Sequence, residues 1–244
     1  METHSTQWRG LYQTGAWAAI AVLVLMPVQM AVFIAYPIPN TVADWFALFQ
    51  QHALIGLLDM DLLLIVDYVF IAVVVLAVCA ALHLVSRSLT TLALLFELLG
   101  LAAYFSSATA MEMLALSRAH AEATTDIDRS ALIAAARAEL ARWDGTAFTV
   151  SYELSAVALL LIGSVMLRSA IFAKAGGYAA VAAGVCSLVP ANAGTPGLLL
   201  SLAALPPTAV WLGFTSKDLF RLSRSAVDAS VRCAPTPPPM SARD

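Results

Sequence analysis

The chain has 244 residues, of which 61% are hydrophobic and 12% are charged, and its formal net charge is -3. Soluble domains contain roughly 45–50% apolar and about 25% charged residues. This chain therefore has too little polar surface to cover a globule in water, and its mean hydropathy of +0.83 agrees. The acidic balance gives no general basic surface for nucleic acid. These features predict an integral membrane protein, with the lipid bilayer as its surroundings, and exclude a nucleic-acid-binding domain.

Six apolar segments are long enough to cross a bilayer as helices of about 20 residues. The predicted spans are residues 15–36, 61–85, 91–113, 146–168, 172–189 and 195–214. The fifth is short and rich in Ala and Gly, which let helix backbones approach closely, so we expect it to be central and in contact with other helices. The fold prediction is an all-α, polytopic transmembrane bundle that forms a single domain over residues 1–222.

Two further helices are predicted outside the spans. Residues 41–52 mix aromatic with polar side chains, which predicts a short helix at the membrane interface after the first span. Residues 130–143 place their apolar side chains on one face, which predicts an amphipathic helix between the third and fourth spans. Asp128 or Ser130 is the expected N-cap of that helix. Residues 223–244 are basic and Pro-rich and are predicted to be a disordered tail.

The distribution of basic residues predicts the orientation. With six spans, nine of the 13 Lys and Arg residues lie on the side of the two termini. The other four all lie in the long connection between the third and fourth spans. Because cytoplasmic loops carry an excess of Lys and Arg, both termini are expected in the cytoplasm.

The candidate functional residues are polar side chains inside the spans, since each costs several kcal/mol unless it faces protein or water. With a rise of about 1.5 Å per residue, Asp67 and Glu153 lie about 10 Å below the outer ends of their spans. Other polar residues fall near the same depth, which predicts a polar cavity near the extracytoplasmic face. The cavity candidates are Gln29, Asp67, Tyr104, Ser106, Thr109, Glu112 and Glu153. The alternative is that these carboxyls accept hydrogen bonds from hydroxyl groups and lock the bundle together.

A second expected contact joins two ionisable residues near the inner side. The short turn between the second and third spans predicts a helical hairpin, in which His83 lies within a turn or two of Glu97. An ion pair between these residues would neutralise two charges inside the membrane.

Motifs of cofactor and metal chemistry are absent from the sequence. Cys79, Cys186 and Cys233 have no CxxC spacing, so neither a disulfide framework nor a zinc site is expected. No Gly-rich phosphate loop and no HExxH pattern occurs. We therefore expect no cofactor and no metal.

Three stretches give the chain a family resemblance. Residues 103–112 read AYFSSATAME, residues 165–174 read VMLRSAIFAK, and residues 210–222 contain VWLGF followed by LFRL. Together they resemble a bacterial family of small multi-pass membrane proteins described only as a domain of unknown function, from the first span to Leu222. The resemblance implies a helical fold in the bacterial cytoplasmic membrane and transfers no catalytic residue.

Three functions fit these observations. The first is binding or moving a small hydrophobic or cationic molecule through the acidic cavity. The second is a structural or regulatory subunit of a membrane complex, with residues 130–143 or the Pro-rich tail as docking surface. The third is an intramembrane enzyme that uses a buried carboxyl as general acid on a lipid or isoprenoid. No paired acid motif supports the enzyme, so a function without catalysis is favoured, and Gly- and Ala-rich helix faces are compatible with a homo-oligomer.

Overall fold

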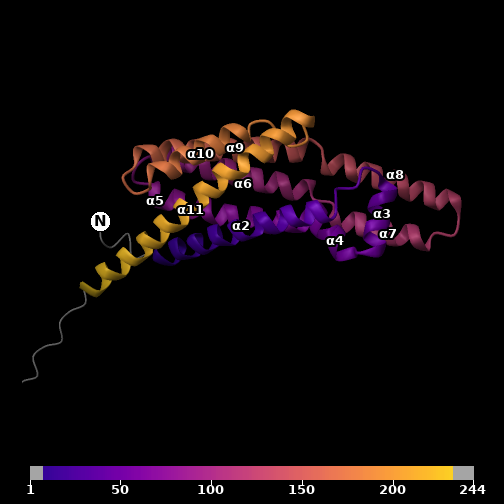
Figure 1. The fold of residues 1–244 in the computed structure, drawn as a ribbon, viewed down its shortest axis with the longest axis horizontal. Helices are drawn as coiled ribbons and strands as arrows, with labels where there is room; N and C mark the ends of the chain where they lie inside the picture. Colours follow the sequence, from indigo (N-terminus) through magenta and orange to yellow (C-terminus); the bar gives the residue numbers. More distant parts are fainter. Residues whose placement is uncertain (1–7, 233–244) are drawn as a thin grey trace, which may run out of the picture.

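The computed structural model describes residues 8–232, and this part of the chain is helical without any strand (Figure 1). The all-α prediction is therefore confirmed. The helices in chain order are α2 (Arg9–Ala35), α3 (Val42–Gln51), α4 (Ala53–Leu57), η1 (Leu58–Leu62), α5 (Leu63–Leu82), α6 (Arg87–Ser107), α7 (Ala110–Glu122), α8 (Asp126–Trp143), α9 (Thr146–Arg168), α10 (Lys174–Cys186) and α11 (Gly194–Arg232).

The long helices pack in a ring. Its order is α2, α5, α6, α9, α10 and α11, and α11 returns to contact α2. Small and branched side chains such as Ala16, Val78 and Ile162 fill the interior of this ring. Leucines such as Leu95 and Leu98 lie exposed on its outer surface, as expected for a surface that contacts lipid rather than water.

Five helical segments of the described chain are long and apolar enough to cross a membrane. They are Arg9–Ala35, Ala53–Leu82, Arg87–Glu122, Asp126–Arg168 and Gly194–Ser225. All five overlap predicted spans. The prediction of several transmembrane helices in one bundle is therefore supported by their length and composition.

The remaining predicted span, residues 172–189, forms the shorter helix α10. Its 13 residues rise about 20 Å, less than the roughly 30 Å of a hydrocarbon core. The connection after it continues in the same direction, because the Asn192 amide donates to Asp144 O and to Thr149 Oγ1 at the start of α9 (2.9 and 3.1 Å). Helix α10 and this connection together therefore return to the end of the bundle at which α9 begins.

Helix α10 packs closely on α9 and α11, as its small residues predict. A Cβ atom on Gly177 would lie 2.8 Å from a methyl carbon of Leu167, and one on Gly176 would lie 3.1 Å from Cβ of Phe214. Such distances are too short for a side chain, so glycine permits this approach of the backbones. The expected protein-contacting position of this segment is confirmed.

Two helix boundaries differ from those predicted. The expected third span, residues 91–113, is interrupted, because α6 ends at Ser107 and α7 begins at Ala110. Helix α11 continues to Arg232, so residues 223–232 are helical where a disordered tail was expected. Residues 233–244 of that predicted tail lie outside the described residues.

A smaller unit, which we call the end unit, consists of α3, α7 and α8 at one end of the bundle (Figure 1). Its core contains Trp45, Phe46, Met113 and Ala136. The Ser117 hydroxyl donates to Phe46 O (3.1 Å) and so joins α7 to α3. The segments predicted as an interfacial helix and an amphipathic helix form α3 and α8, and their apolar faces cover this core.

Helix α8 begins earlier than predicted, with a different N-cap. The Thr125 hydroxyl accepts from the backbone N–H of Asp128 (3.1 Å), so the cap is Thr125 and not Asp128 or Ser130. We expect Thr125→Ala to lower the free energy of unfolding by about 1 kcal/mol, the usual cost of losing a threonine cap. Denaturant titration in detergent, with Thr125→Ser as the control that keeps the hydroxyl, measures the change. Equal losses in both variants would contradict the capping role.

Candidate functional site

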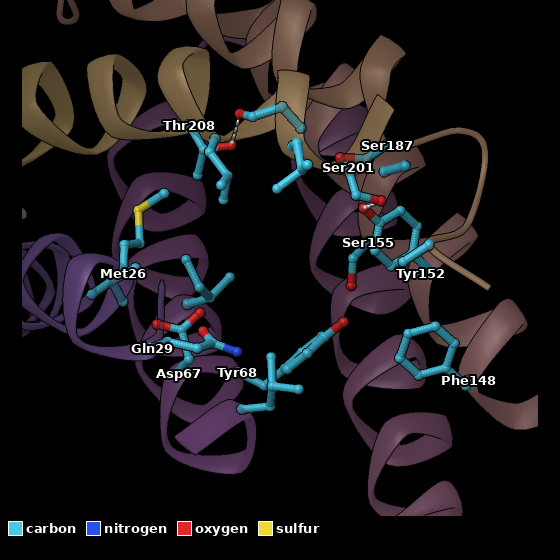
Figure 2. Close-up of a pocket in the computed structure, with 18 of the residues that line it drawn as sticks. Met26, Gln29, Asp67, Tyr68, Phe148, Tyr152, Ser155, Ser187, Ser201 and Thr208 are labelled. Atoms are coloured by element: carbon cyan, nitrogen blue, oxygen red, sulfur yellow. Dashed lines mark hydrogen bonds between the residues drawn. The ribbon is translucent and has the colours of Figure 1, made fainter. Parts of the chain in front are cut away.

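A cavity of about 550 Å³ lies inside the bundle. Figure 2 shows side chains of α2, α5, α9 and α11 around it. Most of the lining is apolar, with Met26 and Met30 from α2 and Leu202 and Leu205 from α11. Such a concave, mostly apolar space with a few polar groups is typical of small-molecule sites.

The charged side chains that line the cavity are all acidic. They are Asp59, Asp67, Glu97 and Asp144, and no Lys, Arg or His is among the described lining residues. Three of these carboxyls have a buried oxygen atom without a hydrogen-bond partner in the described structure, namely both oxygens of Asp59, Oδ1 of Asp67 and Oε1 of Glu97. Asp59 and Glu97 are almost completely buried, with exposed fractions of 1% and 2%.

An unpartnered donor lies at the same cavity. Trp211 of α11 is 1% exposed, and its Nε1–H has no acceptor within the described residues. Native proteins satisfy nearly all buried polar groups with protein, water or ligand. Asp67 is half-buried, so its carboxyl is accessible from the cavity, whereas the unpartnered oxygens and the N–H group lie buried in the lining residues.

The part of the cavity nearest the end unit depends on η1, a single π-helical turn before α5. Residues two positions apart on a helix point in nearly opposite directions, since they lie about half a turn apart. Asp59 therefore faces the cavity, whereas Asp61 faces α7 and α8. Single π-helical turns occur frequently at functional sites.

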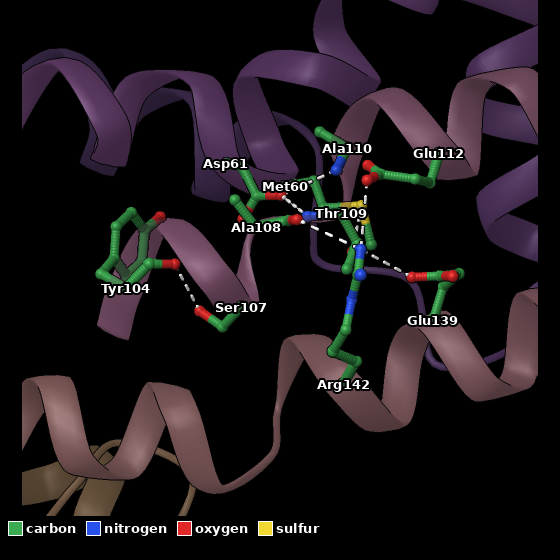
Figure 3. A network of polar contacts seen from close by, with 10 residues as sticks. All are labelled: Met60, Asp61, Tyr104, Ser107, Ala108, Thr109, Ala110, Glu112, Glu139 and Arg142. Atoms are coloured by element: carbon green, nitrogen blue, oxygen red, sulfur yellow. Dashed lines mark hydrogen bonds and ion pairs between the residues drawn. The ribbon is translucent and has the colours of Figure 1, made fainter. Parts of the chain in front are cut away.

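Asp61 is a buried hydrogen-bond acceptor that joins three segments, and Figure 3 shows its contacts with Thr109 and Ala110. Its Oδ2 accepts from the backbone N–H groups of Thr109 (2.6 Å) and Ala110 (2.8 Å). Its Oδ1 accepts from Nε1 of Trp143 (3.0 Å). A carboxyl at the first N–H groups of a helix satisfies its free donors, so Asp61 both starts α7 and fixes the end unit above the cavity.

The predicted cavity residues divide between different places. Gln29 and Asp67 line the cavity, as expected from their depth. Tyr104 is not among the lining residues. Its ring stacks on that of the lining residue Tyr68, with ring centroids 4.2 Å apart and an angle of 12° between the planes. Thr109 is buried beside Asp61, and its backbone N–H donates to the Asp61 carboxylate.

The other three candidates are exposed and do not line the cavity. The Glu112 carboxylate contacts Arg142 (3.2 Å) at the surface of the end unit. The Ser106 hydroxyl donates to Ala103 O within its own helix (2.7 Å). Glu153 lies on α9 between the lining residues Tyr152 and Ser155, but its side chain is exposed on another face of that helix.

His83 and Glu97 do not form the expected ion pair. His83 is exposed in the turn after α5, whereas Glu97 is buried and lines the cavity. The reason is that α6 packs most extensively on α9 rather than on α5, which turns Glu97 away from His83. Within the described residues, no group of three His, Cys, Asp or Glu side chains is arranged to hold a metal ion.

The sequence pattern does not mark Asp59 or Trp211 as cavity residues. Asp59 and Asp61 lie at the edge of the predicted second span, yet both are buried. The available signal was two carboxyls flanking Met60 at the start of a strongly apolar helix, where each charge needs a partner. The sequence does not distinguish Trp211 from an interfacial residue, because a tryptophan near the end of an apolar span equally predicts a position at the membrane surface.

Comparisons of the chain with models of protein families, with curated proteins and with solved structures found no match.

Proposed function

We propose that the protein is an integral membrane protein whose bundle cavity binds a small molecule with an apolar body and a cationic group. The observation that carries the proposal is the set of buried carboxyl oxygens without partners at Asp59, Asp67 and Glu97 in a mostly apolar cavity. A cationic group that donates hydrogen bonds satisfies such oxygens and is attracted by a lining that contains no basic residue. The apolar walls then contact the rest of the molecule.

The proposal includes a position in the membrane. The chain would pass the bilayer six times, with α10 and the connection to α11 as the fifth pass, and the basic residues favour cytoplasmic termini. The end unit then lies on the extracytoplasmic side, and the Asp59 end of the cavity lies closest to it. The resemblance of the sequence to a bacterial membrane family favours the bacterial cytoplasmic membrane as the location.

The test is binding of amines to the purified protein in detergent. We expect primary and quaternary amines to raise the melting temperature of the wild type more than alcohols with the same carbon skeleton. In Asp67→Asn and in Glu97→Gln the affinity should fall by a factor of about ten to a hundred. This factor corresponds to the roughly 1.5–3 kcal/mol of a hydrogen bond to a charged group. Isothermal calorimetry measures the affinities.

Glu153→Gln is the matched control, because Glu153 is a carboxyl on a lining helix but is exposed outside the cavity. It should bind amines as the wild type does. Equal stabilisation by amines and alcohols, or equal losses of affinity in Glu153→Gln and Asp67→Asn, would refute the proposal. Asp67→Asn remains decisive if Glu97→Gln fails to fold.

A further inference from the structure

The seam between α2 and α11 is closed along one half of its length. At that half, the hydroxyl of Ser216 donates to Ala16 O (3.1 Å), and the rings of Trp17 and Phe220 meet edge to face with centroids 5.4 Å apart. A Cβ atom on Gly15 would lie 3.3 Å from a methyl carbon of Leu219. The two helices are therefore in direct contact from Gly15 to Trp17.

The same two helices diverge along the other half. Figure 1 shows α11 crossing α2 and then separating from it toward the end unit. The side chains on either side of the separation line the cavity, including Met30 and Phe33 of α2. On α11, Leu198 and Leu202 line the cavity and are also 53% and 45% exposed. The cavity is therefore open sideways between α2 and α11.

This lateral opening lies on the apolar flank of the bundle. In a membrane, its rim of methionine, phenylalanine and leucine side chains would face lipid chains and not water. Exposed lining residues also occur at the end of the cavity near the end unit, namely Ile38 and Asp144. The cavity thus has one apolar side opening and one more polar opening at its end.

The cavity is elongated along α5. Its lining on this segment runs from Asp59 to Val75, and 16 residues of helix rise about 24 Å. Asp67, with its unpartnered Oδ1, lies near the middle. From Asp67 the wall continues through Ile71 and Val75, and Trp211 of α11 also lines the cavity. On α5 the polar position is thus followed by two apolar side chains, long enough to contact part of an alkyl chain, whereas α6 and α9 contribute Glu97 and Ser155 to the same lining.

Resting on the proposed function, we infer that the ligand is a long-chain amine or ammonium amphiphile that enters from the bilayer between α2 and α11. Its cationic head lies at the half-buried carboxyl of Asp67 in the cavity lining. Its alkyl chain extends along Ile71 and Val75 toward Trp211. A fatty acid of the same length fits the apolar stretch equally but carries the wrong charge for this lining.

Tryptophan quenching in vesicles tests this inference. Bromine atoms on an alkyl chain quench a tryptophan that they contact, and two of the chain's five tryptophans serve as reporters. Trp211 lines the cavity on the alkyl-chain side of Asp67, and Trp17 is 58% exposed on the outer surface of the bundle. Trp143 also lines the cavity, near the end unit, and the comparison with Trp211→Phe separates its contribution. The probes are a brominated long-chain alkylamine and a brominated fatty acid of the same length, each added to wild type, Trp17→Phe and Trp211→Phe in phosphatidylcholine vesicles.

We expect both probes to quench Trp17 from the lipid, and the amine alone to quench Trp211. In Trp17→Phe the amine should therefore still quench the remaining fluorescence more strongly than the fatty acid does. This difference in quenching should decrease in Trp211→Phe and in Asp67→Asn. Equal quenching by the two probes in Trp17→Phe would overturn the inference. If Trp211→Phe does not fold, the comparison of probes in Trp17→Phe is still decisive. Stabilisation by short, water-soluble amines without selective quenching would overturn this inference and leave the proposed function standing.

The route of entry has its own matched pair of variants. The double substitution Leu198→Phe and Leu202→Phe narrows the lateral opening, whereas Ile38→Phe narrows the opening at the end of the cavity. We expect the double variant to slow quenching by the amine several-fold in a stopped-flow experiment and Ile38→Phe to leave the rate unchanged. The reverse result would overturn entry from the bilayer.

Discussion

Asp61→Ala is expected to lower the free energy of unfolding by about 3 kcal/mol or more, because three hydrogen-bond donors lose their shared acceptor. The donors are the N–H groups of Thr109 and Ala110 and the indole N–H of Trp143. Thr109, Ala110 and Asp61 are buried, so water cannot replace the carboxylate at the two backbone donors without opening the structure. An unsatisfied buried polar group costs about 1–3 kcal/mol.

Two comparisons make this prediction specific. Asp61→Asn keeps one oxygen as an acceptor and should lose less stability than Asp61→Ala. Arg142→Ala removes half-exposed ion pairs to Glu112 and Glu139 nearby and should cost about 0–1 kcal/mol. Reversible denaturation in mixed micelles, followed by circular dichroism, measures all three variants. A loss of less than about 1 kcal/mol for Asp61→Ala would show that this contact does not hold the end unit in place.

The second large effect is expected at Gly163, where α9 contacts α10. A Cβ atom there would lie 2.8 Å from Cγ2 and 3.0 Å from the backbone nitrogen of Val181. The second of these atoms cannot move without displacing α10. We expect Gly163→Ala to destabilise the protein by about 1–3 kcal/mol, the typical cost of overpacking, and Gly163→Leu to have a larger effect.

Gly213 provides the control within the same bundle. It is an exposed glycine inside α11, and no atom lies within 4 Å of the position its Cβ would occupy. Gly213→Ala should therefore stabilise the protein by roughly 0.5–1 kcal/mol, since alanine favours a helix more than glycine does. Thermal unfolding of the two alanine variants gives shifts of opposite sign if helix contact decides the outcome. Shifts of the same sign would contradict the close approach of α9 and α10.

The fold was predictable where it depends on the length of apolar segments. Helix α9 has the bounds predicted for its span, residues 146–168, because an apolar run between polar connections determines both ends. The break between α6 and α7 was not predictable. It depends on Asp61, which lies 48 residues before Thr109 in the chain and accepts its N–H group. No local pattern contains such a contact.

The candidate site was predictable in depth but not in direction. A constant rise per residue gives the level of a side chain along the bundle, and Gln29 and Asp67 do line one cavity. The direction of a side chain around its helix depends on which neighbours that helix packs against. Glu153 and Glu97 show the consequence, since the first is exposed and the second lines the cavity although it was predicted to pair elsewhere.

The ring of helices is closed by α2 and α11, the first and last helices of the described chain. During synthesis, the other walls of the cavity are therefore complete before α11 leaves the ribosome. Until then Asp67 and Glu97 lie on an open face, and packing of α11 is the step that encloses them. Contacts between segments so distant in the chain form slowly, because a long loop must first be ordered. An arrested chain that ends before α11 would thus leave the cavity open along one side.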